Sequence, residues 1–378
     1  MNVGKSDKSI LIVDDTAIYR QIFLKAAEQI PSVGRVEVAR SGREAVQMVR
    51  KGGFGLVICD LIMPEMDGLL TLNEIQNVRP EQQIVVVSGV SSRDSDITVE
   101  ALSLGALDFI EKPRGKDMEA NLNQLSGAFY RLLRTAALAR PQAVKQRSES
   151  PKPTTLRAVP KQSVTPRLSS LQTLAVGTPA LVLIGVSTGG PNALKQLLPK
   201  IPADFPAPIA LVQHMPAGFT ATLARQLDSE CSLTVREAEE GDTLKAGTVY
   251  IAPGGKHLEL NTTASNDVLA CTITDGVPVN SCKPAVDILF GSVAASSYRR
   301  SVLSVILTGM GNDGADGVAA LKQGKSICLT QSQDSCVVYG MPKAVDDRSL
   351  SDEQVPLDSM AERILAWAMP GYKNEKSA

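Results

Sequence analysis

The sequence predicts two α/β domains, each with a doubly wound parallel sheet, joined by a flexible linker. Three observations predict this fold class. The chain has 378 residues, which is long for one domain. Short β-branched runs alternate with helical patterns in two separate regions. Between these two regions the alternation of strand and helix patterns is absent, and Pro, Ser, Thr and basic residues predominate. We predict a first domain over 8–134, a linker over 135–177 and a larger second domain over 178–370.

The first domain is expected to hold five strands. A last helix is expected over 118–134, because four apolar residues recur there at the spacing of one buried face. These residues are Leu122, Leu125, Phe129 and Leu132. The predicted strands are Ile10–Asp14, Val36–Ala39, Leu56–Cys59, Ile84–Ser88 and Phe109–Ile110.

The linker and the second domain follow. Five prolines between 141 and 166, with seven basic residues and one acid between 140 and 167, favour a solvated tether over a docking motif. Helices are expected over Asn192–Leu198 and Pro284–Ala295. The strands predicted in the second domain are Leu181–Gly185, Ile209–Gln213, Val249–Ala252 and Leu303–Thr308.

Composition excludes several classes of protein. A net charge of -1 leaves no global basic field for nucleic acid or an anionic membrane. The start is polar and no apolar run approaches the roughly 20 residues that span a bilayer, so we expect a cytoplasmic monomer without membrane insertion. Six scattered cysteines without a CxxC pair, beside only two histidines, favour buried thiols over a metal site.

Acidic residues end the strands of the first domain. Asp14 and Asp15 end the first strand and Asp60 ends the third, at the edge where open α/β sheets place their sites. Carboxylates crowded there favour a Mg²⁺ ion. With Mg²⁺ and Lys112 to neutralise charge, Asp60 is a candidate phosphoryl acceptor, and Ser88 is placed to hydrogen-bond the phosphoryl group. Each aspartate alone is more commonly a helix cap.

Together with Ser88 and Lys112-Pro113, the string Cys59-Asp60-Leu61-Ile62-Met63-Pro64-Glu65-Met66-Asp67-Gly68 resembles the receiver domain of two-component response regulators. The resemblance implies a five-stranded receiver that a histidine kinase phosphorylates on Asp60. It implies that Asp14, Asp15, Asp60 and the Ile62 carbonyl bind Mg²⁺. It also implies that Ser88 and Phe109 form the switch pair.

A glycine-rich turn opens the second domain. The strand Leu181–Gly185 runs into Val186-Ser187-Thr188-Gly189-Gly190-Pro191 and then a helix. This turn presents Ser187 where free N–H groups stabilise an oxyanion. A phosphate-binding loop is the alternative, although the GxGxxG spacing is absent.

A nucleophilic serine needs a base and a carboxylate. His214 directly follows a strand and shares the sheet edge with Ser187, whereas His257 lies in a turn and is expected to shape the cleft. Asp313, after the strand Leu303–Thr308, is the candidate that orients the imidazole. Asp316 lies in the following helix, where capping is its ordinary role.

Five segments resemble the chemotaxis protein-glutamate methylesterases. They are Gly185–Pro191, Gln213–Pro216, Val249–Gly254, Leu307–Gly314 and Tyr339–Pro342. The resemblance implies hydrolysis of glutamate methyl esters, and deamidation of glutamines, on methyl-accepting chemoreceptors, with a chemotaxis histidine kinase as phosphodonor. It implies Ser187 as nucleophile, His214 as base, Asp313 as its orienter and the Met310 N–H as oxyanion donor, with no esterase cofactor.

One segment departs from the family pattern. Where a stretch such as Gly-His-Arg-Pro-Ser-Val-Asp is expected, the chain has Ser281-Cys282-Lys283-Pro284-Ala285-Val286-Asp287. Lys283 cannot make the bidentate contacts of an arginine, so the departure concerns substrate preference.

Two further function classes remain as alternatives. The second domain of a non-enzymatic signalling module would only bind a partner under control of the receiver. A DNA-binding regulator is disfavoured by the balanced charge and the lack of a terminal helix-turn-helix pattern.

Overall fold

The computed structural model describes residues 9–30, 33–89, 91–112, 178–263 and 268–371, with separate residues between 119 and 133. The predicted linker over 135–177 lies outside the described residues, so the three domain boundaries stay predictions. In the described part of the chain, no helix is both long and apolar enough to cross a bilayer.

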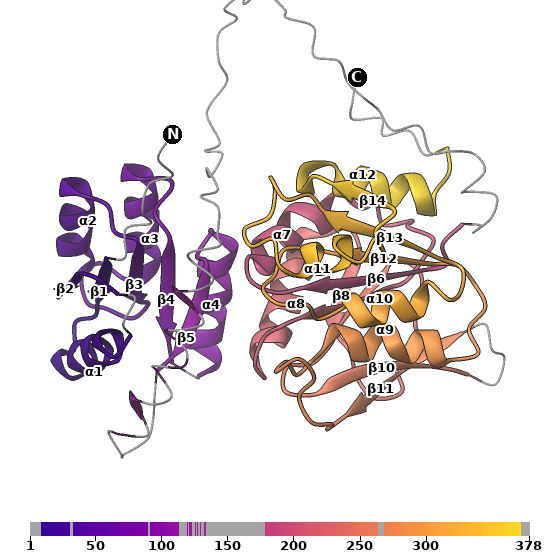
Figure 1. Ribbon diagram of the computed structural model, residues 1–378, viewed down its shortest axis with the longest axis horizontal. Helices are drawn as coiled ribbons and strands as arrows, with labels where there is room; N and C mark the ends of the chain where they lie inside the picture. The colour runs from indigo at the N-terminus through magenta and orange to yellow at the C-terminus, as the bar shows by residue number, and fades with distance from the viewer. Residues whose placement is uncertain are drawn as a thin grey trace, which may run out of the picture.

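The first domain is a five-stranded parallel sheet in the order β2-β1-β3-β4-β5, as the sequence predicts (Figure 1). The strands are β1 (Ile10–Val13), β2 (Val36–Ala39), β3 (Leu56–Asp60), β4 (Ile84–Ser88) and β5 (Asp108–Glu111). The helices between them are α1 (Ala17–Glu28), α2 (Gly42–Lys51), α3 (Gly68–Val78) and α4 (Ser92–Ser103). The ends of β2 and β4 are as predicted, and those of β1, β3 and β5 differ by one residue, because pairing decides where a strand stops.

The last helix of this domain is described only in part. Leu125, Phe129 and Leu132 are helical and buried, and the Phe129 ring lies 5.8 Å from that of Phe23 in α1. Leu122 is partly buried. These residues pack in the expected way, whereas the other residues of the predicted helix lie outside the described part.

The second domain contains a seven-stranded parallel sheet in the order β14-β13-β12-β6-β7-β9-β8. The four predicted strands correspond to β6 (Leu181–Val186), β7 (Ile209–Gln213), β9 (Thr248–Ile251) and β12 (Val302–Ile306). The prediction missed β8 (Thr234–Glu237), β13 (Ser326–Gln331) and β14 (Glu353–Val355). The two edge strands have only three or four residues, too few for a periodic signal.

A separate antiparallel hairpin, β10 (His257–Thr262) with β11 (Leu269–Thr274), was also missed. The prediction that His257 lies in a turn is therefore wrong. Pairing with Thr274 makes His257 the first residue of β10, since the turn before it ends at Lys256.

Helices cover both faces of the larger sheet. One face packs against α7 (Gly190–Leu197), α8 (Phe219–Glu230) and α12 (Leu357–Ala368). The other packs against α9 (Val286–Ala295), α10 (Ala315–Leu321), α11 (Met341–Asp346) and the hairpin. Strand β6 packs against both helical layers. Val182 and Ile184 face the first layer, and Leu181 and Leu183 face the second. Burial on both faces explains its continuous apolar run.

Strand order places the site. From β6 the chain continues to β7 on one side, while β12 pairs with β6 on the other. The order therefore reverses between β12 and β6, and such a reversal opens a crevice at the carboxyl ends of the strands. The segments after β6, β7 and β12 carry Ser187, His214 and Asp313, so this topology brings the three predicted residues to one edge.

The two domains are in contact in this structure. Helix α4 of the first domain packs on α7 and α8 of the second (Figure 1). The ring centroids of Phe109 in β5 and Phe219 in α8 are 4.6 Å apart. The face of the first domain formed by α4 and β5 therefore lies against the helices that follow Ser187 and His214.

Candidate active site

The acidic residues of the first domain form one pocket. Asp14, Asp15 and Asp60 offer carboxylate oxygens within 4.8 Å of one another. The Lys112 Nζ lies 2.6 Å from Asp60 Oδ2 and 3.3 Å from Asp14 Oδ2. The structure thus brings together the four residues that the sequence placed here.

Burial governs the charge of this pocket. It raises the pKa of Asp60 to about 6, although Lys112 opposes the rise, and it raises the pKa of Asp14. Asp14 Oδ2 is buried without a hydrogen-bond partner, having only the longer ion pair with Lys112. A hard divalent cation would supply the charge and the ligand contact that these oxygens lack, so the residues fit Mg²⁺.

The two predicted switch residues have well-defined partners. Ser88 Oγ donates to the Gly89 carbonyl at 2.9 Å and accepts from Thr98 Oγ1 at 2.5 Å. The Phe109 ring packs on Phe219 of the other domain. Sequence analysis missed Thr98. No local pattern distinguishes it from other helix residues, and its contact with Ser88 exists only when α4 packs against β4.

Ser187 lies in the turn between β6 and α7, as predicted. Its backbone N–H donates to the Thr308 carbonyl and its own carbonyl accepts from Gly190 N–H, at 3.0 and 2.8 Å. Gly189 has φ +77°, a left-handed conformation that favours glycine, which explains the residue type at this turn. The buried Gln213 donates from Nε2 to the carbonyls of Ser187 and His214 and so joins the two segments.

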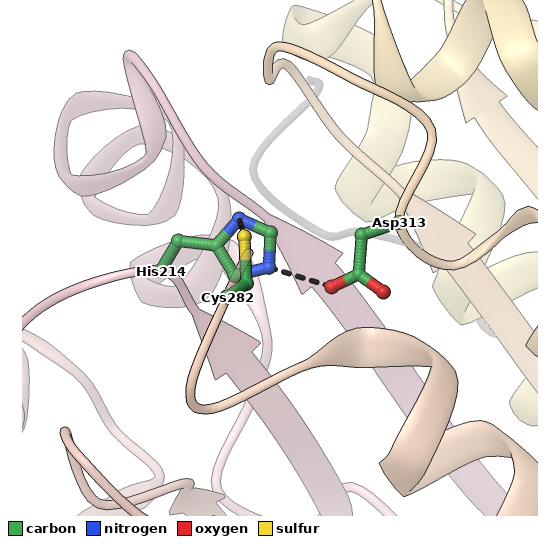
Figure 2. A group of neighbouring side chains, drawn as sticks. All are labelled: His214, Cys282 and Asp313. Carbon is green, nitrogen blue, oxygen red and sulfur yellow. Dashed lines mark hydrogen bonds and ion pairs between the residues drawn. The ribbon is translucent and has the colours of Figure 1, made fainter. Parts of the chain in front are cut away.

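His214 and Asp313 are in direct contact. Their Nε2 and Oδ2 atoms are 2.7 Å apart (Figure 2). Burial, the largest single influence, opposes the charged imidazole, but Asp313 and Cys282 together outweigh it and raise the pKa of His214 to about 9. Burial likewise opposes the charged carboxylate most strongly, but His214 and the N–H groups of Val286 and Asp287 together outweigh it and lower the pKa of Asp313.

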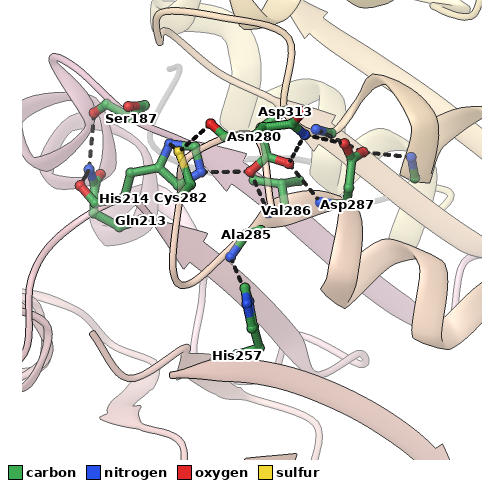
Figure 3. A network of polar contacts seen from close by, with 12 residues as sticks. Ser187, Gln213, His214, His257, Asn280, Cys282, Ala285, Val286, Asp287 and Asp313 are labelled. Atoms are coloured by element: carbon green, nitrogen blue, oxygen red, sulfur yellow. Dashed lines mark hydrogen bonds and ion pairs between the residues drawn. The ribbon is translucent and has the colours of Figure 1, made fainter. Parts of the chain in front are cut away.

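Asp313 is held from behind by backbone and side-chain donors (Figure 3). The N–H groups of Val286 and Asp287, at the start of α9, donate to it at 2.7 and 3.1 Å. Asn280 Nδ2 donates to Asp313 at 3.1 Å and to Asp287 at 2.8 Å. This shared donor offsets the repulsion between the two carboxylates. A helix N-terminus stabilises the negative charge there. Sequence analysis missed Asn280 and Asp287, whose role exists only once α9 meets the loop after β12.

His257 supports this arrangement from a distance. Its Nδ1 accepts from Ala285 N–H at 3.2 Å, and its Nε2 donates to the Val277 carbonyl at 3.0 Å. Both ring nitrogens are thereby used and the side chain is buried. His257 fixes the start of α9 rather than facing Ser187, in agreement with the expected role of shaping the cleft.

The other ring nitrogen of His214 faces a thiol. Cys282 Sγ lies 3.5 Å from His214 Nδ1. Within the described residues, no hydrogen bond joins Ser187 Oγ to His214. The expectation of buried thiols holds for Cys59, Cys271, Cys328 and Cys336 but is wrong for Cys231 and Cys282, which are partly exposed.

The remaining predicted residues surround the crevice. A Cβ built on Gly309 would lie 2.8 Å from Ser187 Cβ and 2.3 Å from Met341 Sδ, so the Gly309-Met310 backbone packs directly on the serine. Asp316 pairs with Arg348 at 2.6 Å, away from His214. Lys283 pairs with the exposed Asp275 at 2.8 Å.

Comparison with known proteins gives a matching family for each domain. The CheB methylesterase family matches residues 182–364, and the response regulator receiver domain family matches residues 10–122. A protein-glutamate methylesterase/protein-glutamine glutaminase of Desulfotalea psychrophila is 37% identical over 94% of this chain and 97% of its own. One of Nitratidesulfovibrio vulgaris is 40% identical over 94% of this chain and 98% of its own.

Proposed function

The chain belongs to the CheB-type protein-glutamate methylesterase/protein-glutamine glutaminases with a receiver domain. From this premise we propose that it demethylates glutamyl side chains of methyl-accepting chemoreceptors by a Ser187-His214-Asp313 mechanism. The observation that carries the proposal is the 2.7 Å contact between His214 and Asp313 at the sheet edge that also holds Ser187.

In this proposal each catalytic atom has one role. Asp313 accepts from His214 Nε2–H, which leaves Nδ1 as the nitrogen that takes the proton of Ser187. Ser187 Oγ attacks the γ-carbonyl carbon, and His214 returns the proton to the leaving methanol, or to ammonia from a glutamine. Water then cleaves the acyl-enzyme with His214 as base. Contacts between nucleophile and base commonly tighten only when substrate binds.

An oxyanion donor is needed for the attacked carbonyl. The N–H of Ser187 is already bonded to Thr308, so it is not available. The contact of Gly309 with Ser187 supports the predicted Met310 N–H, because it places the next peptide beside the serine.

The receiver supplies regulation in this proposal. A histidine kinase of the chemotaxis system transfers phosphate to Asp60. Asp14, Asp15 and Asp60 would hold Mg²⁺, which neutralises charge on the phosphoryl oxygens, and Lys112 pairs with the transferred group. Resting contacts support restraint of the esterase, since Thr188, the neighbour of Ser187, donates to Asp108 of β5 at 3.3 Å.

Methanol release from methylated receptor membranes tests the proposal, with and without a small phosphodonor and Mg²⁺. We expect release from the full-length protein and a rise with phosphodonor. Absence of methanol in both conditions, from folded protein, would refute it.

A further inference from the structure

The free side of the catalytic imidazole carries a second potential ligand. His214 Nδ1 and Cys282 Sγ are 3.5 Å apart, with Asp313 beyond the ring (Figure 2). In a tetrahedral zinc site, bond lengths of about 2.0–2.1 Å to nitrogen and about 2.3 Å to sulfur put those two atoms about 3.5 Å apart. The pair is therefore already spaced as one edge of such a site.

Asp313 prepares His214 for this role. A metal-binding histidine commonly donates its other N–H to a carboxylate, which fixes the ring and increases its basicity as a ligand. Here His214 Nε2 contacts Asp313, and the Val286 and Asp287 N–H groups hold that carboxylate in place (Figure 3). The ring is thus oriented with Nδ1 toward Cys282.

The surroundings of Cys282 allow a cation to enter. The side chain is partly exposed, and its Sγ lies 3.5 Å from the Asn280 carbonyl oxygen, a further oxygen donor. The adjacent Lys283 is paired with Asp275, so its ammonium is directed to another partner. With so few protein ligands, water would complete the coordination, as in sites that exchange their metal.

We propose that Cys282 and His214 form a binding site for a thiophilic divalent cation of the Zn²⁺ class. A cation there uses the Nδ1 lone pair and keeps Cys282 as a thiolate. His214 can then no longer accept the proton of Ser187, so hydrolysis stops until the cation leaves. This consequence rests on the proposed function, whereas binding itself does not. The sequence hides the site because its ligands are 68 residues apart.

Binding is tested on the full-length protein with Co²⁺ as the probe, in excess Mg²⁺ to fill the carboxylate pocket of the receiver. A thiolate bound to Co²⁺ absorbs in the near ultraviolet, and carboxylates do not. We expect this band to saturate at about one equivalent, to disappear on addition of Zn²⁺ and to be lost in Cys282→Ser. The control is Cys231→Ser, which alters the other partly exposed cysteine and keeps the band. A wild-type protein without the band, or a band that survives in Cys282→Ser, overturns the proposal.

Hydrolysis is then measured with Zn²⁺ and with a chelator, each protein being compared with itself. We expect Zn²⁺ to lower wild-type turnover at least about tenfold, chelator to restore it, and the Cys282→Ser ratio to stay near unity. Equal inhibition of both proteins overturns the site. A thiolate band without any hydrolysis in chelator would instead refute the proposed esterase mechanism and leave the cation site standing.

Discussion

At the scale of single residues, the hydrogen bond between His214 and Asp313 is the contact on which the proposed mechanism depends. It supports a charged imidazole in a largely buried position, which the low-polarity surroundings alone would disfavour. The same bond uses Nε2, so Nδ1, which lies 3.5 Å from Cys282 Sγ, is the nitrogen proposed to accept the proton of Ser187. If Ser187, His214 and Asp313 act as the proposed unit, the effects of changing the three are expected to be strongly non-additive.

Replacing Ser187 or His214 with alanine should lower kcat by roughly 10⁴ or more, because each removes a step that the other two cannot replace. Asp313→Asn should also be severe. The matched control is His257→Ala, which should cost less because His257 bonds the Ala285 N–H and the Val277 carbonyl rather than a residue of the proposed triad. Turnover on methylated receptors, with circular dichroism to verify folding, measures this. If His257→Ala were as damaging as His214→Ala, the base would be misassigned.

The pH dependence follows from the raised pKa of His214. Because that pKa is about 9, the resting base is largely protonated at neutral pH, and kcat/KM should rise as pH approaches about 9. The ion pair between His214 and Asp313 makes its full contribution to the free energy of unfolding below the ordinary histidine pKa of about 6.5. This contribution is lost as the pH rises to about 9. Asp313→Asn should move the rise of kcat/KM to lower pH. A pH–rate profile that keeps its midpoint in this variant contradicts the assignment.

In the receiver, Asp60 is the residue that should carry phosphate. With Mg²⁺ and acetyl phosphate the protein should gain an acid-stable, base-labile acyl phosphate, and Asp60→Asn should gain none. Lys112→Ala should keep the label but lose the response of the esterase, since Lys112 pairs with the transferred group. Label that persists in Asp60→Asn would exclude this site.

At the scale of elements, the loops after β6 and β12 meet through glycine. Gly309 lies so close to Ser187 and Met341 that any side chain must displace one of them. The close approach lets the peptide after Gly309 sit beside the nucleophile. We therefore expect activity to depend on this loop geometry as well as on the three proposed catalytic side chains.

Gly309→Ala should lower kcat by one to two orders of magnitude, because the added methyl group moves Ser187 away from the Met310 peptide. Gly291→Ala is the control, since a Cβ in the middle of α9 meets no atom within 4 Å. That change should leave kcat unaltered and stabilise the fold by about 0.5–1 kcal/mol. Steady-state kinetics and thermal unfolding distinguish the two. Full activity in Gly309→Ala would show that the contact is dispensable.

At the scale of the whole molecule, the α4 and β5 face of the receiver lies on the esterase domain. Its apolar part is the Phe109–Phe219 contact, and its polar part includes the pair of Asp96 with Arg225 at 2.8 Å. Both side chains of that pair are more than half exposed, so it contributes only about 0.2–1 kcal/mol. Phosphorylation typically changes such a docking equilibrium by a coupling free energy of about 1–3 kcal/mol. A weak contact between the domains can be released by a free energy of this size.

Asp96→Arg should loosen this interface and raise the activity of the unphosphorylated protein up to about fivefold, as about 1 kcal/mol allows. The double variant Asp96→Arg/Arg225→Glu exchanges the charges and should return activity toward the wild-type value. A fragment beginning near Ser169 should be fastest and ignore phosphodonor. Resting activity is measured on a small soluble ester as well as on receptors. Failure of the fragment to exceed the resting parent on both would exclude steric inhibition.

The sequence alone predicted two parallel sheets, with all five strands of the first and four of the seven in the second, and it supplied the candidate residues of the two sites, because apolar periodicity and strand-end motifs are local signals. Strand pairing was decided by tertiary contacts, which explains why the short edge strands β8 and β14 and the hairpin of His257 escaped prediction. Asn280, Asp287 and the contact of Cys282 with His214 likewise exist only in the folded chain. Their partners are distant in sequence, and no local pattern encodes which segments a reversal of strand order brings together.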